Sequence, residues 1–292
     1  MDNALPARWQ TRQFGLAALL ITAAFALPLL QLFRLSLRSE LHSYIILIPV
    51  ISIYLVWMAR RPGPAVAGQR SLFPAVFAGL GGLASLGIHW SLPRPGSLPP
   101  TQSLWLLVLA WLLFVLAAAL FTLGWSRLKP HAFALGFLVF MLPLPPAATD
   151  WMSMALQHAS AEASDVCLRL TGLPVLRTGM IFQMPGLTIQ VAEECSGLRS
   201  TLILFITSLL AGKLFLRAGW KRAVLALATI PLGILRNAFR ITTLSWLTVN
   251  VDAGIIHGPL HHQGGPFFFA LSLVPLFLLL WTFRKSESAQ KP

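Results

Sequence analysis

The sequence predicts an all-α polytopic membrane protein with about eight transmembrane helices and a small extracytoplasmic insertion made of a helix and a β-hairpin. The first observation behind this prediction is composition: of 292 residues, 56% are hydrophobic and 11% are charged, and the mean hydropathy is +0.73. A soluble protein carries about 25% charged residues. The second observation is that eight apolar stretches approach the length of about 20 residues that a spanning helix needs.

The eight predicted spans are separated by short polar segments. They lie near residues 13–33, 42–59, 72–92, 103–123, 130–147, 196–212, 223–248 and 266–283. The first span follows Arg8 and Arg12, as a signal peptide would, but its apolar run is long and further spans follow. We therefore interpret it as an uncleaved first helix.

The distribution of Lys and Arg predicts the orientation of these spans. Short cytoplasmic loops are enriched in Lys and Arg, and placing the N-terminus inside collects most of these residues on one side. The inner set is Arg8, Arg12, Arg60, Arg61, Arg70, Arg127, Lys129, Lys213, Arg217, Lys221, Arg222, Arg284, Lys285 and Lys291, which are 14 of the 22. Both termini are therefore expected in the cytoplasm.

The long segment 148–195 between the fifth and sixth spans is predicted to lie outside. Its first part, from about Thr149 to Thr171, places apolar and polar residues at loose helical spacing, which is typical of a helix on the membrane surface. The stretch Val175–Val191 has short β-favouring runs separated by glycine and proline, which indicates a small β-hairpin. No internal repeat or soluble appendix is evident, so residues 1–292 are predicted to form a single membrane domain.

The net charge of +13 does not indicate a nucleic-acid partner. On such an apolar chain the basic residues are better explained by topology, and the expected surroundings are membrane lipid. The two cysteines, Cys167 and Cys195, form no CxxC pair and have no repeated Cys/His spacing. A disulfide scaffold, a structural zinc site and a cofactor are therefore not predicted.

Three polar groups within or beside the predicted spans are candidates for function. They are Glu193–Ser200 at the outer start of the sixth span, Arg236–Arg240 in the seventh, and His257–Gly265 before the eighth. Ionisable residues in a membrane are costly and usually face a bundle interior or an aqueous cavity. Their shared position near the outer face predicts one site.

Cys195 is the candidate nucleophile of this site. It lies where the predicted hairpin enters a helix, and the positive end of a helix favours a thiolate. Arg199 follows four residues later and is expected on the same helical face. The alternative is a small packing residue, which is the usual role of a lone membrane cysteine. Cys167 has no comparable setting and keeps that second interpretation.

Arg236 and Arg240 share one face of the seventh span. One interpretation makes them buried structural partners of Glu193 and Glu194, and for Arg236 this is as probable as a functional role. Arg240 lies closer to the outer end, where its guanidinium would hold an oxyanion or lower the pKa of a thiol.

The histidines supply the third element. His257 and His261 have the i,i+4 spacing of a metal pair, but Gly258 and Pro259 interrupt the helix that such a pair needs. A metal site is therefore not predicted, and a histidine near a thiol indicates a general base and acid. Nucleophile, oxyanion stabiliser and proton shuttle together make a complete set for acyl transfer.

At these residues the chain resembles the exosortase/archaeosortase family of membrane cysteine transpeptidases. The matching segments are Glu194-Cys-Ser-Gly-Leu-Arg-Ser200, Asn237-Ala-Phe-Arg240, His261-x-x-x-Gly265 with Phe267–Phe269, and the early span from His42 to Pro49. The resemblance implies that Cys195 is the nucleophile, Arg240 the catalytic arginine and His261 the catalytic histidine. The adjacent His262 is the alternative to His261, and His257 is a weaker candidate. Supporting roles fall to Arg199, Glu194, Asn237, His262 and Arg236.

The resemblance also implies a substrate and a location. Family enzymes act at the outer face of the cytoplasmic membrane on exported proteins whose C-terminal sorting signal is a short motif such as Pro-Glu-Pro, a transmembrane helix and a basic tail. They are thought to transfer the new carboxyl end to a surface acceptor, and are often associated with exopolysaccharide loci. Two other functions stay open: a transporter or glycan-lipid flippase whose intramembrane arginines bind an anionic substrate, and a structural or assembly role.

Overall fold

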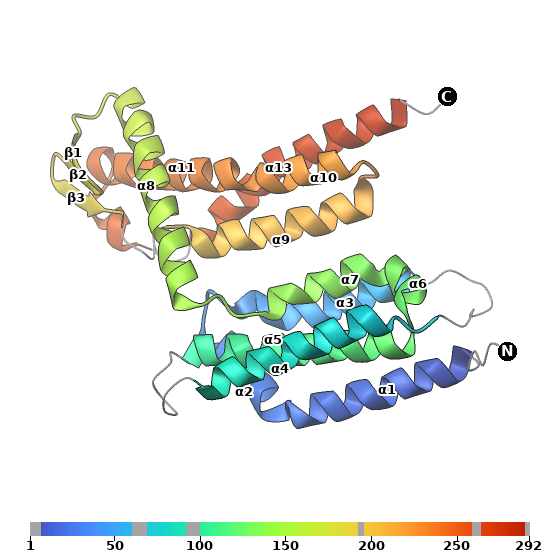
Figure 1. Ribbon diagram of the computed structural model, residues 1–292. Helices are drawn as coiled ribbons and strands as arrows, with labels where there is room; N and C mark the ends of the chain where they lie inside the picture. The colour runs from blue at the N-terminus through green and yellow to red at the C-terminus, as the bar shows by residue number, and fades with distance from the viewer. Residues whose placement is uncertain (1–6, 60–68, 92–99, 192–195, 259–263, 290–292) are drawn as a thin grey trace. The chain divides into compact units, whose positions relative to one another are not determined.

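The computed structural model describes residues 7–59, 69–91, 100–191, 196–258 and 264–289 (Figure 1). The chain is mostly helical, as the composition predicts, and contains one small sheet. Its contacts group into two compact units, Met1–Ala148 and Thr149–Pro292.

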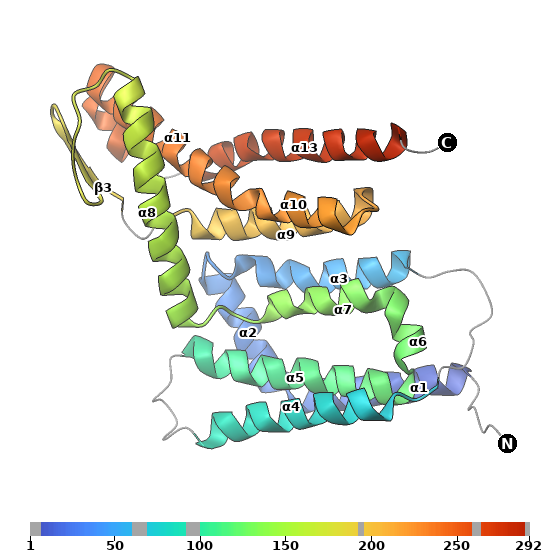
Figure 2. The ribbon, with the colours of Figure 1, turned by 45° about the horizontal axis from the view of Figure 1, so that its top comes forward.

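The first unit is entirely helical in its described part. Its elements are α1 (Ala7–Ala24), α2 (Ala26–Arg38), η1 (Ser43–Ile46), α3 (Leu47–Met58), α4 (Leu72–Ser91), α5 (Pro100–Thr122), α6 (Trp125–Leu128), η2 (Lys129–His131), α7 (Ala132–Phe137) and η3 (Leu138–Met141). The helices α4 and α5 lie side by side in both views (Figures 1 and 2).

Small residues bring α4 and α5 together. A Cβ atom added at Gly82 would lie 2.9 Å from the ring of Phe114, so this glycine allows the large ring to pack against the α4 backbone. Ser85 Oγ donates a hydrogen bond of 2.7 Å to the carbonyl of Leu106 across the same contact. Close approach through small residues and polar contacts between helices are typical of helix packing in membranes.

The second unit combines five helices with the sheet. Its elements are α8 (Pro146–Leu170), whose first residues belong to the first unit, then β1 (Leu176–Thr178), β2 (Ile181–Met184), β3 (Leu187–Gln190), α9 (Leu198–Phe215), α10 (Gly219–Leu227), α11 (Thr229–Asn250), η5 (Ala253–His257) and α13 (Gly265–Ala289). Figures 1 and 2 show α8 running across the direction of α9, α11 and α13.

The core between α9, α10, α11 and α13 is made of aliphatic side chains. Leu204, Leu225 and Leu276 are at most 1% exposed and belong to one cluster. The outward faces of the same helices carry large apolar side chains, among them Trp220 and Trp281. In water such a surface would be unfavourable, so it fits a protein surrounded by lipid.

The sheet has three antiparallel strands in the order β1-β2-β3. The prediction of a two-stranded hairpin is therefore wrong, because the segment forms three strands. Gly179 (φ 65°) and Gly186 (φ 73°) both adopt left-handed backbone conformations. Each allows a tight turn, so the segment reverses twice. The surface helix predicted over 149–171 corresponds to α8.

The end of the second unit where α9 is followed by α10 is held by a buried lysine. Lys221 on α10 is 5% exposed, and its Nζ donates to Ser286 Oγ at 2.7 Å and to the Phe283 carbonyl at 3.3 Å. The Glu287 carboxylate lies 3.8 Å away and accepts hydrogen bonds from the backbone N–H groups of residues 217 and 218. This cation has its countercharge within the protein.

Five helices in the described part of the chain are long and apolar enough to cross a membrane: Leu72–Ser91, Thr101–Thr122, Leu198–Phe215, Gly219–Asn250 and Gly265–Ala289. Two bent pairs raise the number to seven if each counts as one span, and one of them is Arg8–Ala24 with Ala26–Arg38, bent by 70°. The helix Ser43–Met58 is shorter, about 24 Å at 1.5 Å per residue, against a hydrocarbon core of about 30 Å. The predicted count of eight is therefore not confirmed, although a multi-pass membrane protein is.

Candidate active site

The structure describes only part of the predicted site. Glu193, Glu194, Cys195, His261 and His262 lie outside the described residues. Of His257 the structure describes the backbone, which ends η5. The side chains of the remaining predicted residues, Arg199, Arg236, Asn237 and Arg240, are described, together with the elements that flank the missing segments.

Helix α9 begins immediately after a glycine whose conformation no other residue adopts easily. Gly197 is the N-cap of α9 and has φ 73°, in the left-handed region. Its carbonyl accepts hydrogen bonds from Thr201 N–H at 2.9 Å and from Ser200 Oγ at 3.1 Å, which close the first turn. Because the helix begins at Leu198, the helical spacing between positions 195 and 199 that the sequence suggested does not apply.

Gly197 also lies directly against α11. A Cβ at this position would be 2.6 Å from Arg236 Nη2 and 3.5 Å from Asn237 Cγ, so a larger residue would displace the arginine. Arg236 Nη2 donates to the Gly197 carbonyl at 3.4 Å. Arg236 is 8% exposed and Asn237 is 2% exposed. The N-terminus of α9 thus packs against two buried polar side chains of α11.

A second close contact lies one helical turn further along both helices. A Cβ at Gly233 of α11 would collide with Thr201 of α9. This pair was not identified from the sequence, where the only signal is a glycine within an apolar span. This contact fixes the position of α9 along the axis of α11. It therefore also determines that Gly197 lies opposite Arg236.

Arg240 lies one turn beyond Arg236 on α11 and is half-buried. The neighbouring Ile241 is 9% exposed and packs in a cluster with Phe182 of β2 and with Val191, the residue that follows β3. The segment 192–195 is therefore flanked by Val191 and by Gly197, and both flanks pack on α11 between residues 236 and 241.

The helix that follows the histidine segment reaches the same stretch of α11. Phe268, near the start of α13, is 2% exposed, and its ring lies edge-on to that of Phe239, with centroids 6.1 Å apart. Phe239 directly precedes Arg240. The structure thus brings the flanks of the cysteine and histidine segments to one stretch of α11, residues 236–241, which also carries both arginines.

Arg199 differs from the other arginines. It lies in the first turn of α9 and is exposed. Arg236, in contrast, is enclosed by the protein.

The sheet is attached to α8 by an exposed ion pair. Arg177 Nη2 lies 2.7 Å from Glu162 Oε1, and the guanidinium stands over the ring of Phe182 at 5.7 Å. The hydrogen bond and positive charge of Arg177 hold the pKa of the Glu162 carboxyl below its usual value. The sheet also packs through Phe182 in the same core cluster as Ala161 of α8 and Ile241 of α11, so both helices hold its buried face.

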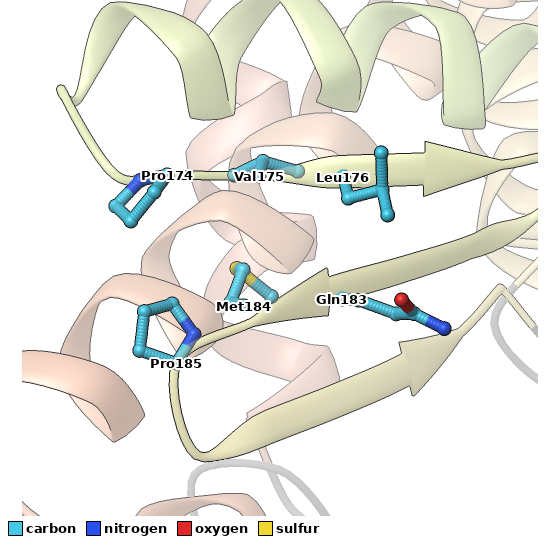
Figure 3. Close-up of a pocket in the computed structure, with 6 residues that line it drawn as sticks. All are labelled: Pro174, Val175, Leu176, Gln183, Met184 and Pro185. Atoms are coloured by element: carbon cyan, nitrogen blue, oxygen red, sulfur yellow. The ribbon is translucent and has the colours of Figure 1, made fainter.

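An open hollow of about 430 Å³ lies at the turn end of the sheet (Figure 3). Its lining consists of Pro174, Val175, Leu176, Gln183, Met184 and Pro185. None of these six side chains is titratable or nucleophilic, so the hollow does not supply acyl-transfer chemistry.

The early motif forms the connection between α2 and α3. His42 is 5% exposed and precedes η1, and its Nδ1 lies 3.0 Å from Ser39 Oγ. Tyr44, Ile45 and Ile48 of the same motif are buried. In the described residues this motif thus packs within the first unit.

No group of three or more His, Cys, Asp and Glu side chains arranged to hold a metal ion occurs among the described residues. Cys167, the other cysteine, is half-buried on α8.

Residues 36–278 match the family described as transmembrane exosortase. The match covers most of the chain and all three polar groups, so the chain belongs to this family of membrane proteins. No curated protein and no solved structure matches it.

Proposed function

We propose that the protein is a cysteine transpeptidase or endopeptidase of the cytoplasmic membrane, with its active site on the outer face. Its substrates are exported proteins with a C-terminal sorting signal of a short motif, a transmembrane helix and a basic tail. Membership of the exosortase family supports this role, and the chemistry of the three polar groups supplies the mechanism.

One observation carries the proposal: the flanks of the cysteine and histidine segments pack on the same six residues of α11 that bear the arginines. Cys195 precedes Gly197 by two residues, and two residues of extended chain span at most about 7 Å. We therefore expect the thiol near the N-terminus of α9 and near Arg236. A site for acyl transfer needs nucleophile, oxyanion stabiliser and proton shuttle within reach of one carbonyl group.

The first half-reaction forms a thioester. The Cys195 thiolate attacks the scissile carbonyl carbon, and the electron pair of the C=O bond moves to the oxygen. Arg240, with Arg199 as a second candidate, stabilises this oxyanion. As the tetrahedral intermediate collapses, the C–N bond breaks and His261 protonates the leaving amine, which carries the transmembrane helix and the basic tail.

The second half-reaction releases the product. His261, now neutral, removes a proton from an amine, hydroxyl or water, and this acceptor attacks the thioester carbonyl. Collapse of the second intermediate expels the Cys195 thiolate. An amine or hydroxyl acceptor on the cell surface gives transpeptidation, and water gives hydrolysis.

The test compares the two cysteines. We expect Cys195→Ala to abolish cleavage of a tailed exported protein from the same cell, and Cys167→Ala to retain nearly full activity, because only Cys195 lies between two elements packed on α11. The measurement is cleavage per folded enzyme in membranes, with hydroxylamine capture of the thioester as a second readout. Equal loss in both variants at normal protein levels would show that the thiols act through structure.

A further inference from the structure

The edges of the three-stranded sheet differ in a way that indicates a docking site. Edge strands expose unpaired backbone groups, and proteins usually protect them with charged residues or proline. The edge strand β1 follows Pro174 and carries Arg177 at its centre. The edge strand β3 reads Leu187-Thr-Ile-Gln190, with neither charge nor proline.

The register shows which backbone groups β3 leaves open. Val191 N–H donates to the Met180 carbonyl at 3.0 Å, so Val191 points its backbone groups toward β2. In an antiparallel pair this direction alternates from residue to residue. Leu187 and Ile189 therefore also bond β2, whereas Thr188 and Gln190 direct their N–H and C=O groups away from it.

Both outward residues are exposed, and no hydrogen bond to their outward backbone groups is present among the described residues. The free edge thus offers two donors and two acceptors at the spacing of an extended strand. The same reasoning leaves β1 only Arg177 as an outward residue. Figure 3 shows β1 and β3 on opposite sides of β2.

We infer that β3 is the substrate-docking strand of this enzyme. The occupant is the extended segment of the exported protein that immediately precedes the scissile bond, added to the sheet as a fourth strand. This inference rests on the proposed function and specifies how the substrate is held. An edge strand gives affinity through main-chain hydrogen bonds, and these do not depend on side-chain identity.

The position of β3 in the chain supports this occupant and sets its direction. In the sequence, Cys195 follows Gln190, the last residue of β3, by five residues, and Val191 anchors the strand end on α11 by packing with Ile241, the neighbour of Arg240. The retained part of the substrate precedes the scissile bond, so its chain also runs toward the nucleophile. The substrate strand therefore pairs with β3 in the parallel sense.

The sheet provides a matched pair of positions for a test. Leu176 on β1 and Thr188 on β3 are the two cross-strand neighbours of Gln183, one on each edge, and both are exposed. Thr188→Cys and Leu176→Cys are each placed in the background Cys167→Ala/Cys195→Ala, which leaves the tailed exported protein uncut. Single cysteines are introduced along the substrate segment before its cleavage site, and a short bismaleimide is added to membranes.

We expect Thr188→Cys to crosslink to alternate substrate positions and Leu176→Cys to give no crosslink. Gln190→Cys serves as the second variant and should show the same alternation, displaced along the substrate. Crosslinking from both edges, from neither, or between two enzyme chains at position 188 would overturn the inference.

A kinetic comparison separates this inference from the proposed function. Thr188→Pro removes one outward N–H, at a position where an edge strand tolerates proline, and its kcat/KM should be about two- to tenfold lower than that of Thr188→Ala, which keeps this N–H. If the wild-type enzyme does not cleave the tailed protein, the proposed function fails. If it cleaves and Thr188→Pro is as active as Thr188→Ala, strand docking alone is wrong.

Discussion

Two buried cations of the second unit differ in the partners that the described residues give them. Lys221 on α10 is bonded to Ser286 and the Phe283 carbonyl and lies beside the carboxylate of Glu287. Arg236 on α11 is buried to a similar degree, yet the structure gives it one carbonyl partner at 3.4 Å and no carboxylate among the described residues.

The difference indicates which charge is structural. A buried cation that is paired within the protein contributes little potential to its surroundings, because its field is cancelled locally. Arg236 lies one turn before Arg240 on α11, so two positive charges lie close together at this end of the second unit, whereas Lys221, near the other end, has its countercharge beside it.

The largest effect is expected when two single variants are compared, each of which removes the cation at one end. Arg240→Ala should lower turnover by about 10²- to 10³-fold, which is the usual consequence of losing one oxyanion donor. Lys221→Met should leave the rate per folded enzyme unchanged and lower stability by about 1–3 kcal/mol, because it removes two buried hydrogen bonds. Both quantities are measured on purified protein, by substrate cleavage and by thermal melting. A rate loss in Lys221→Met as large as in Arg240→Ala would remove the distinction between the ends.

A smaller effect is expected from a pair of glycines. Gly197→Ala places a Cβ against Arg236 at positive φ, which costs about 1–2 kcal/mol for the backbone alone. It should lower stability by at least that amount and reduce cleavage through displacement of the arginine. Gly219→Ala, at the start of α10, meets no atom within 4 Å and should be neutral in both assays. Neutral behaviour of Gly197→Ala would mean that the contact with Arg236 is not needed.

The smallest effect is expected from the exposed ion pair that ties the sheet to α8. Because Arg177 lowers the pKa of Glu162 in the folded state, the pair contributes stability above the usual value of 4.5 and loses it as the pH falls through the lowered pKa. Wild type should therefore be slightly more stable than Glu162→Gln at neutral pH, and their melting curves should converge in acid. A difference that grows toward low pH would contradict this assignment.

Composition and periodicity were sufficient for the coarse fold. Long apolar runs with few charges predict spanning helices, and each of the predicted spans 72–92, 103–123, 196–212, 223–248 and 266–283 overlaps with such a helix. The bend after Ala24 was missed although the sequence carries a signal for it: Pro28 has no N–H to donate to the carbonyl of Ala24, and its ring clashes with that carbonyl, which bends a helix. The third strand was missed because two turn signals, Gly179 and Gly186, were assigned to one hairpin.

The site was predictable in its residue types and not in its geometry. Arginines and a cysteine within apolar surroundings are visible in any single sequence, because their cost in a membrane makes them conspicuous. Gly197, at the start of α9, contacts Arg236, which is 39 residues away in the sequence. Pairings between distant residues such as Val191 and Ile241 leave no periodic trace in either segment, and so cannot be read from local patterns.

The packing of Gly197 against α11 also has a consequence for the order in which the chain is synthesised and folds. A ribosome adds about 5–20 residues per second, so the 39 residues that separate Gly197 from Arg236 take about 2–8 s to synthesise. During that interval the start of α9 has been synthesised, but the part of α11 on which it packs has not. The arrangement around Gly197 thus cannot exist in a nascent chain that stops before α11, and it is completed only after this late helix has entered the membrane.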